Sequence, residues 1–308
     1  NMYYTRLLVP DIRLKKCYVH WIKVKELISA GMWNSISRLS QVLSDGLDLV
    51  ITNIWISAYL MGELSIAQQI PTYISTLTNT LINLFSPNLT MYYAKDDTEA
   101  VVKELKLSMK FSSFFVNIIF CILVIFGKYF MQLWVPNQDV DLIYSLLVVI
   151  MMSLLVSGVT TSLNNVFLVT NRLKVNSIFW LIISFTNVLL VFIFLNTTSL
   201  GIYAVAGVSK VTGILGNLIF VPLYACKCLK IKWNTFYPII FRYIGTTVIM
   251  MVVFFGIRTL YVLPINWITF FAVCVIAGIA GCIVNFFLLL NHMERDIMVN
   301  KIRAKVGK

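Results

Sequence analysis

Six polar or charged side chains recur at steps of three and four residues within a long and otherwise apolar run near the start of the chain. These steps place them on one face of a helix. The six residues are Asn34, Arg38, Gln41, Asp45, Asp48 and Thr52. Because a charge at the centre of a bilayer costs about 2.5–3.5 kcal/mol, we expect this face to line a bundle interior or a wet cavity.

Two interpretations of these charges remain open. Arg38 and Asp45 are seven residues apart, which is roughly 10 Å along a helix, so they can neutralise each other only through another helix or through water. In the first interpretation they form such a structural pair. In the second, which we favour, they serve a cavity.

The next apolar run carries an uncharged polar stripe. Its members again share one helical face: Gln69, Tyr73, Thr76, Thr80, Asn83 and Pro87. Amides and hydroxyls are groups that hydrogen-bond sugars. The alternative is that they hold helices together, where each bond is worth about 0.6 kcal/mol. Two neighbouring polar stripes favour a cavity, and the lone cation Lys210, near the middle of a later apolar run, is expected to face one too.

The sequence contains no pattern that would carry out covalent chemistry. It has no cluster of metal ligands, no glycine-rich phosphate loop and no nucleophile beside a base. His20 and His292 lie at the margins of apolar runs, and the six cysteines are not the framework of a short exported protein. We therefore expect neither an enzyme nor a bound metal or cofactor.

Composition indicates which elements hold these residues. Apolar residues make up 59% of the 308 residues and charged residues 12%, against roughly 45–50% and 25% in soluble domains. The mean hydropathy is +0.85. The chain is therefore expected to be an all-α integral membrane protein, because helices satisfy their backbone groups internally, and a soluble enzyme is excluded.

A membrane helix needs about 20 mostly apolar residues, and eight runs qualify. They are Leu27–Ala58, Leu64–Tyr93, Lys110–Leu133, Leu142–Val169, Val175–Leu195, Gly201–Cys226, Tyr237–Leu260 and Trp267–Asn291. The first two are long enough to need tilting, breaks or interfacial ends, and if they break, Gly46 and Pro71 are the expected positions. Residues 95–110 are predicted to be a surface helix capped by Asp96 or Asp97, or else a solvated connector.

The basic residues predict an orientation. With eight spans, nearly all Lys and Arg outside the spans fall on one side, and Lys128 and Arg258 fall on the other. By the positive-inside rule both ends of the chain are cytoplasmic. The net charge of +12 then indicates contact with anionic lipid headgroups rather than nucleic acid. The chain opens without a signal peptide, on a basic segment typical of the interior of a longer chain.

Several stretches resemble a known family. They are GMWNSISRLSQVLSDGLDLVITN from Gly31, AQQIPTYISTLTNTLINLFSPNLTMYYAKDD from Ala67, VKELKLSMKFS from Val102 and FGKYFMQLWVP from Phe126. They resemble the lipid-linked oligosaccharide (O-antigen or capsule repeat-unit) flippases, the polysaccharide biosynthesis transporters of the multidrug/oligosaccharidyl-lipid/polysaccharide exporter superfamily. The resemblance covers residues 23–136 well and the rest by the order of spans, which makes this chain similar to the C-terminal portion of such a protein.

The resemblance implies an architecture. The family has twelve to fourteen helices in two six-helix lobes around a central cavity. Residues 1–25 then correspond to the cytoplasmic connection between lobes and 26–228 to the second six-helix lobe. Residues 229–292 correspond to two appended transmembrane helices and 293–308 to a basic cytoplasmic tail. The first, N-terminal lobe is missing from the sequence, and one lobe alone cannot enclose a passage.

The resemblance also implies roles and partners. The substrate is an isoprenoid-diphosphate-linked oligosaccharide that moves from the cytoplasmic to the outer leaflet of the bacterial inner membrane. Asp45 and Asp48 are candidates for cation coupling. The candidates for contact with substrate in the cavity are Arg38, Lys210, Asn34, Gln41, Gln69, Tyr73, Thr80 and Asn83. Expected partners are the lipid-linked substrate, anionic lipids, the missing lobe and polysaccharide polymerase machinery.

Three other functions stay open at this point. The first is a cation-coupled multidrug exporter of the same superfamily, which Arg38 and Lys210 disfavour. The second is a membrane-embedded sugar transferase or polymerase, which the short outer loops disfavour. The third is a structural fragment without activity of its own.

Overall fold

The computed structural model describes residues 20–260, 266–290 and 295. Within that part of the chain the secondary structure is helical and contains no strand. Side chains of a few residues of the first helix, among them Gln41 and Asp45, lie outside the description, as do most of the predicted connection 1–25 and the predicted tail 293–308.

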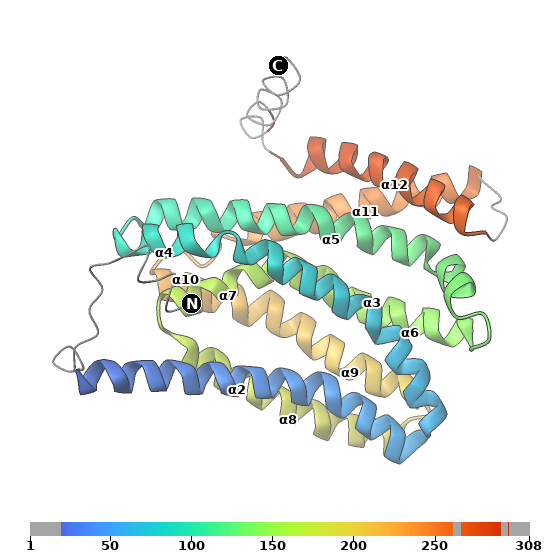
Figure 1. Cartoon of the computed structure of the whole chain (residues 1–308), viewed down its shortest axis with the longest axis horizontal. Coiled ribbons are helices and arrows are strands. Elements are labelled where there is room, and N and C mark those ends of the chain that lie inside the picture. Colours follow the sequence, from blue (N-terminus) through green and yellow to red (C-terminus); the bar gives the residue numbers. More distant parts are fainter. Residues whose placement is uncertain (1–19, 261–265, 291–294, 296–308) are drawn as a thin grey trace, which may run out of the picture.

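Among the described residues, six stretches are long and apolar enough to cross a membrane, so the chain is a multi-pass membrane protein. They are Thr98–Trp134, Val140–Val169, Leu173–Thr197, Ile202–Leu229, Tyr237–Thr259 and Trp267–Leu288. The first two predicted spans fall outside this set, because their polar stripes lower their hydropathy. The count of eight spans therefore stays a prediction, although both helices lie alongside the others (Figure 1).

The first half of the chain differs from prediction in its breaks. Its elements are α2 (Trp21–Ile51), the π-helical turn η2 (Thr52–Ile56), α3 (Ala58–Asn83), α4 (Ser86–Ala94) and α5 (Thr98–Trp134). Helix α2 passes Gly46 and α3 passes Pro71 without interruption, so both predicted breaks are wrong. The break instead separates α3 from α4, just before Ser86 and Pro87.

The predicted surface helix at 95–110 is also wrong as a separate element. Its residues form the first third of the continuous α5, which has 37 residues. The Asp97 side chain caps this helix by accepting a hydrogen bond from the Ala100 amide at 2.9 Å, as one of the two predicted caps. Residues 98–110 are therefore part of the bundle and not a connector.

The second half follows the predicted spans more closely. Its elements are α6 (Val140–Thr160), the 3-10 turn η3 (Thr161–Leu163), α7 (Asn164–Val169), α8 (Leu173–Thr197), α9 (Ile202–Leu215), the π-helical turn η4 (Gly216–Phe220), α10 (Val221–Leu229), α11 (Tyr237–Leu260) and α12 (Trp267–Leu288). Two of the predicted spans are thus each divided into two helices by a short irregular turn.

The helices lie side by side along the long axis of the molecule (Figure 1). Helix α5 packs against α6, α11 and α12, while α2 packs against α8, and α9 lies against both α6 and α8. One end of the bundle, which we call the basic end, holds the turns that carry Lys95, Arg172 and Lys230. The opposite end, which we call the far end, holds the turns after η2, α5 and α8.

The buried apolar residues form two separate cores. The far-end core includes Leu64, Phe126 and Phe254. The basic-end core includes Leu105, Phe167 and Tyr243. Helices α5, α6 and α11 contribute to both cores, so the two ends of the bundle are joined mainly through these three helices.

Candidate functional site

The polar stripe of α3 lies on an exposed face. Gln69, Tyr73, Thr80 and Asn83 are all exposed, and 66% of Tyr73 is accessible. The buried face of the same helix carries Leu64, Ala67, Pro71 and Ile74 and packs on α6. The predicted separation of a polar from an apolar face therefore holds for these residues. The exposed face also carries an apolar residue, Leu77, which is 61% exposed.

Three threonines run along this exposed stripe at intervals of four residues. Each hydroxyl donates a hydrogen bond to a backbone carbonyl one turn earlier: Thr72 to Gln68 at 2.8 Å, Thr76 to Thr72 at 2.9 Å and Thr80 to Thr76 at 2.9 Å. Since each hydroxyl proton is already used, the oxygens present lone pairs outward. The stripe can therefore accept hydrogen bonds from hydroxyl-rich ligands. Sequence analysis did not single out Thr72, although its spacing from Thr76 and Thr80 was a usable signal.

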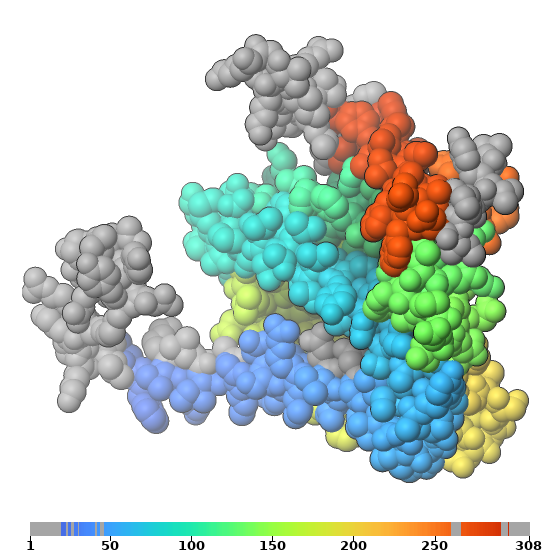
Figure 2. Space-filling view, turned by 45° about the vertical axis from the view of Figure 1, so that its right-hand side comes forward, coloured from blue at the N-terminus to red at the C-terminus, as the bar shows by residue number. Residues whose placement is uncertain are grey.

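Helix α3 borders a recess. Figure 2 shows a hollow between α2, in blue, and the α3–α4 segment, in cyan and teal. The two helices diverge from the η2 turn at the far end toward the basic end (Figure 1). We call this hollow the recess.

The polar stripe of α2 divides into two parts. Asn34 and Arg38, in the half nearer the basic end, are exposed. Asp48 and Thr52, nearer the far end, are buried. The structure therefore separates residues that the sequence placed on one continuous face, and the change falls where α9 begins to cover α2.

The buried half contains a charged cluster between α2 and α9. The Ser209 hydroxyl donates a hydrogen bond to Asp48 Oδ2 at 2.9 Å, and Lys210 Nζ lies 4.0 Å from the same oxygen. The side chains of Lys210 and Asp48 are 15% and 5% exposed. The structure thus brings together two residues to which the family resemblance gives different roles.

Further hydrogen bonds attach α8 to α9 and to α2, the two helices that hold this cluster. Thr212 of α9 donates to Asn187 Oδ1 of α8 at 2.5 Å, and Ser184 of α8 donates to the backbone oxygen of Ser40 in α2 at 3.1 Å. Ser209 and Thr212 were missed in the sequence analysis, although their positions one residue before and two after Lys210 placed them close to it. Helices α2, α8 and α9 are therefore held together by polar contacts.

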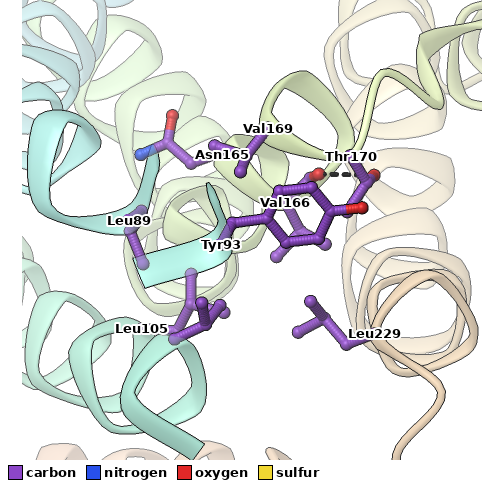
Figure 3. Close-up of a pocket in the computed structure, with 9 residues that line it drawn as sticks. Leu89, Tyr93, Leu105, Asn165, Val166, Val169, Thr170 and Leu229 are labelled. Atoms are coloured by element: carbon purple, nitrogen blue, oxygen red, sulfur yellow. Dashed lines mark hydrogen bonds between the residues drawn. The ribbon is translucent and has the colours of Figure 1, made fainter. Parts of the chain in front are cut away.

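The described residues contain no group of three or more His, Cys, Asp or Glu side chains that could hold a metal ion. A small pocket lies at the basic end, apart from both stripes (Figure 3). It is lined by Leu89, Tyr93, Val101, Leu105, Asn165, Val166, Val169, Thr170 and Leu229. The Thr170 hydroxyl donates to the Val166 carbonyl at 2.7 Å, and the walls are mostly apolar, so the pocket belongs to the basic-end core.

Comparison with known proteins places the fold. No family model matches the chain. Over 307 residues, all of this chain and 60% of the relative, it is 24% identical to the uncharacterized membrane protein EpsK of Bacillus subtilis (strain 168). The structure matches the lipid II flippase MurJ in its inward closed conformation with a TM-score of 0.57 and 18% identity, covering 82% of this chain and 51% of that one.

These matches define the chain as a multi-pass helical membrane protein with a MurJ-like fold. They agree with the resemblance to flippase-like proteins, while the O-antigen or capsule assignment is finer than either match. The chain spans 60% of the length of the EpsK relative and 51% of the MurJ chain.

Proposed function

We propose that the chain forms part of a flippase that moves isoprenoid-diphosphate-linked oligosaccharides from the cytoplasmic to the outer leaflet by alternating access, for cell-surface polysaccharide synthesis. One observation carries this proposal: in a chain with the fold of a lipid flippase, the uncharged polar stripe of α3 and Arg38 of α2 are exposed on helices that border one recess. The chemistry of these groups matches the two polar parts of such a substrate.

Each part of the substrate has a counterpart in the recess. A diphosphate carries about two negative charges, which an arginine guanidinium binds through paired hydrogen bonds. The amides of Gln69 and Asn83 and the acceptor oxygens of the threonines suit sugar hydroxyls. Asn34, Tyr73 and Gln41 complete the proposed contacts, while the apolar tail stays in the lipid.

Lys210 and the two aspartates have a second proposed role. Asp48 holds Lys210 through a contact of 4.0 Å, so Lys210 reaches the diphosphate only when that contact opens. Asp45 and Asp48 are the proposed cation-coupling residues, because a bound cation can replace the Lys210 ammonium beside the Asp48 carboxylate.

A passage needs a second wall. We propose that a second helical lobe closes the recess, since the chain spans only 60% and 51% of the proteins it matches, and that the two lobes rock against each other. The proposed setting is the bacterial inner membrane, with the basic end on the cytoplasmic side against anionic lipids and with polysaccharide polymerase machinery nearby.

The membrane potential assists this direction of transport. Moving one charge through 100 mV changes its free energy by about 2.3 kcal/mol. For a dianion leaving an interior-negative cell, the gain is roughly 4–5 kcal/mol at that potential. Collapsing the potential while keeping the proton and sodium gradients is therefore expected to slow export, and an unchanged rate removes the electrical contribution.

The central experiment measures flipping of a fluorescent isoprenoid-diphosphate oligosaccharide in vesicles that contain the complete transporter. Arg38→Ala is expected to lower the rate much more than it lowers the folded yield. Lys128→Ala is the matched control, because Lys128 lies at the far end in an exposed pair with Asp141. Equal losses of rate and folded yield in Arg38→Ala contradict the proposal and support a structural role.

The same vesicles separate the other functions. A cation-coupled multidrug exporter would move a cationic aromatic dye and leave the lipid-linked oligosaccharide in its original leaflet. A transferase or polymerase would change the mass of that lipid. The proposal expects neither outcome.

A further inference from the structure

Three helices are interrupted at the same level of the bundle. Among the first six predicted spans, these are the three whose chain runs from the far end to the basic end. The interruptions are residues 84–85 between α3 and α4, Thr161–Leu163 between α6 and α7, and Gly216–Phe220 between α9 and α10. Each lies about ten residues before a basic-end turn, roughly 15 Å at 1.5 Å per residue. Helices α2, α5 and α8, which run the other way, are continuous at this level.

The two apolar cores meet at this level. Leu89 of α4, Phe167 of α7 and Ala225 of α10 belong to the basic-end core. Ile74 of α3 and Val205 of α9, before the interruptions, belong to the far-end core. The basic-end segments pack on one another, with α7 against both α4 and α10, and α4 also packs on α5.

Next to the basic-end core residues Leu105, Met109, Val159 and Leu163 of α5, α6 and η3 lie small hydroxyl side chains, which we call the hydroxyl layer. Its members are at most 1% exposed: Ser108, Ser112, Ser113, Thr160 and Ser162. Ser108 donates to Ser162 Oγ at 3.1 Å, and Ser112 donates to the Gly158 carbonyl at 2.8 Å. These bonds join α5 to the end of α6 and to η3. They can re-form after a small displacement, whereas interlocked apolar side chains resist one.

A single hydrogen bond links two of the interruptions directly. Thr160 Oγ1, at the end of α6, lies 3.3 Å from Asn217 Oδ1 in η4. The Asn217 amide in turn donates to the Gly213 carbonyl at 2.9 Å. The last residue of α6, directly before η3, therefore shares a polar contact with η4, and η3 and η4 are expected to move together.

The prolines after two of the interruptions release backbone groups. Pro87 and Pro222 stand in the first turn of α4 and α10 and lack the amide proton that would bond four residues back. For Pro222 the released carbonyl is that of Leu218, and the Tyr237 hydroxyl of α11 donates to it at 3.1 Å. A side chain of another helix thus satisfies the carbonyl that Pro222 leaves without its usual backbone partner.

We propose that the hydroxyl layer is a pivot on which α4, α7 and α10 turn as one unit against the far-end part of the bundle, with the continuous α5 as the axis. Since α4 forms one wall of the recess at the basic end (Figure 1), this movement changes the width of its mouth. The pivot adds a movement inside the chain to the rocking of whole lobes, and it stands or falls independently of the transported substrate.

The test locks the pivot and follows amide hydrogen exchange. Ser108→Cys with Ser162→Cys places two thiols where the hydroxyl oxygens are 3.1 Å apart, which suits a disulfide between α5 and η3. Ser37→Cys with Ser177→Cys is the matched lock, because those oxygens are 2.7 Å apart on the continuous helices α2 and α8. Oxidised and reduced forms of each variant, and oxidised wild type, are compared in the complete protein in lipid nanodiscs.

In the reduced protein, amides of η3 and η4 are expected to exchange about tenfold faster than those of α5 at the same level. Oxidising the Ser108–Ser162 variant slows exchange in η3 and η4 together by about tenfold. The α2–α8 lock leaves both unchanged. Slowing of η3 alone overturns the proposal, because a local cross-link does that without a common movement, and so does slow exchange at both turns in the reduced protein.

A second variant covers the case in which the double-cysteine protein does not fold. Thr160→Val keeps the shape of the side chain and removes the contact with Asn217. It is expected to make η4 exchange about tenfold faster than η3, because the two turns no longer move together. Thr78→Val is the control, since this buried threonine donates within its own helix to the Ile74 carbonyl at 2.7 Å. Unchanged exchange of η4 in Thr160→Val contradicts the proposal.

Discussion

The recess wall formed by α2 and α3 contrasts with the block formed by α5, α6, α11 and α12. A methyl group added at Gly46 or Gly62 in the wall would meet nothing within 4 Å. At Gly158 in the block it would lie 2.7 Å from Val116, and at Gly281 it would lie 3.0 Å from Ile118. The block is therefore packed to contact where Gly158 and Gly281 face a neighbouring helix, although Gly245, Gly256 and Gly278 of α11 and α12 also meet nothing within 4 Å.

Polar groups follow the same division. In the block, Asn117 of α5 donates to Asn285 Oδ1 of α12 at 3.0 Å, and Asn285 donates to the Phe114 carbonyl at 3.0 Å. Both asparagines are fully buried. In the wall, Thr72, Thr76 and Thr80 of α3 donate to their own helix backbone and are exposed. Similar residue types thus serve as links between helices in one region and as a binding surface in the other, and the neighbouring helix decides which.

The largest expected effect falls on the buried half of α2, where the wall meets α9. Asp48→Leu is expected to lower the free energy of unfolding by about 3 kcal/mol, because breaking a buried ion pair leaves the remaining charge poorly compensated. Adding Lys210→Met is expected to restore most of the loss. Thermal unfolding in detergent micelles measures both. If the double variant loses as much as the sum of the single variants, Asp48 and Lys210 are not coupled.

The next effect tests the tight packing of the block. Gly158→Ala is expected to cost about 1–3 kcal/mol, since the new methyl group overlaps Val116 and the helices must separate. Gly62→Ala in the wall is the control and is expected to be neutral or stabilising by up to about 1 kcal/mol, because alanine favours helix. Thermal unfolding in detergent micelles measures both variants. Equal unfolding midpoints for Gly158→Ala and Gly62→Ala would contradict the difference in packing between the block and the wall.

A smaller effect is expected at the link between α5 and α12. Asn285→Leu should cost about 1–2 kcal/mol, because the Asn117 amide loses its partner in an apolar setting. Combining it with Asn117→Leu should recover stability, since replacing both partners leaves no buried polar group unpaired. A double variant less stable than Asn285→Leu alone would show that packing, and not the polar pair, dominates there.

The smallest effect on stability belongs to the open stripe. Thr76→Val with Thr80→Val should change the unfolding free energy by less than about 0.5 kcal/mol, as expected for exposed positions, while slowing transport of the lipid-linked oligosaccharide. Vesicle flipping and thermal unfolding are measured on the same preparation. A stability loss as large as that of Asn285→Leu would mean that the stripe is a helix contact after all.

The sequence was sufficient to predict the helical membrane fold and most of the helix positions, because long apolar runs report directly on burial in lipid or protein. The helix breaks could not be located from Gly46 and Pro71. An exposed glycine costs a helix little, and α3 accommodates Pro71 without ending. The interruptions instead precede Pro87 and Pro222, which stand in the first turn of the following helices, where proline is favoured.

Sequence periodicity predicted the candidate site as one polar face on α2 and one on α3. The predicted face of α3 is exposed, whereas that of α2 is exposed in one half and buried in the other. Periodicity says which residues share a face and not what covers that face along its length. Whether Asp48 lies in a recess or against Ser209 depends on where α9 crosses α2. That crossing is set by contacts between residues about 160 positions apart in sequence. The Asp48–Ser209 hydrogen bond is one such contact. The roles of Arg38 and Gln41 remain predictions.

The asparagine pair between α5 and α12 also bears on how the chain can be shortened. The last two helices look dispensable in sequence, because almost all their residues are apolar. Ending an expression version before Tyr237 would uncover the carboxamide of Asn117 and the surface around Ile118 to the acyl chains. Boundaries for crystallisation or domain exchange should therefore keep α11 and α12 with the helix they cover.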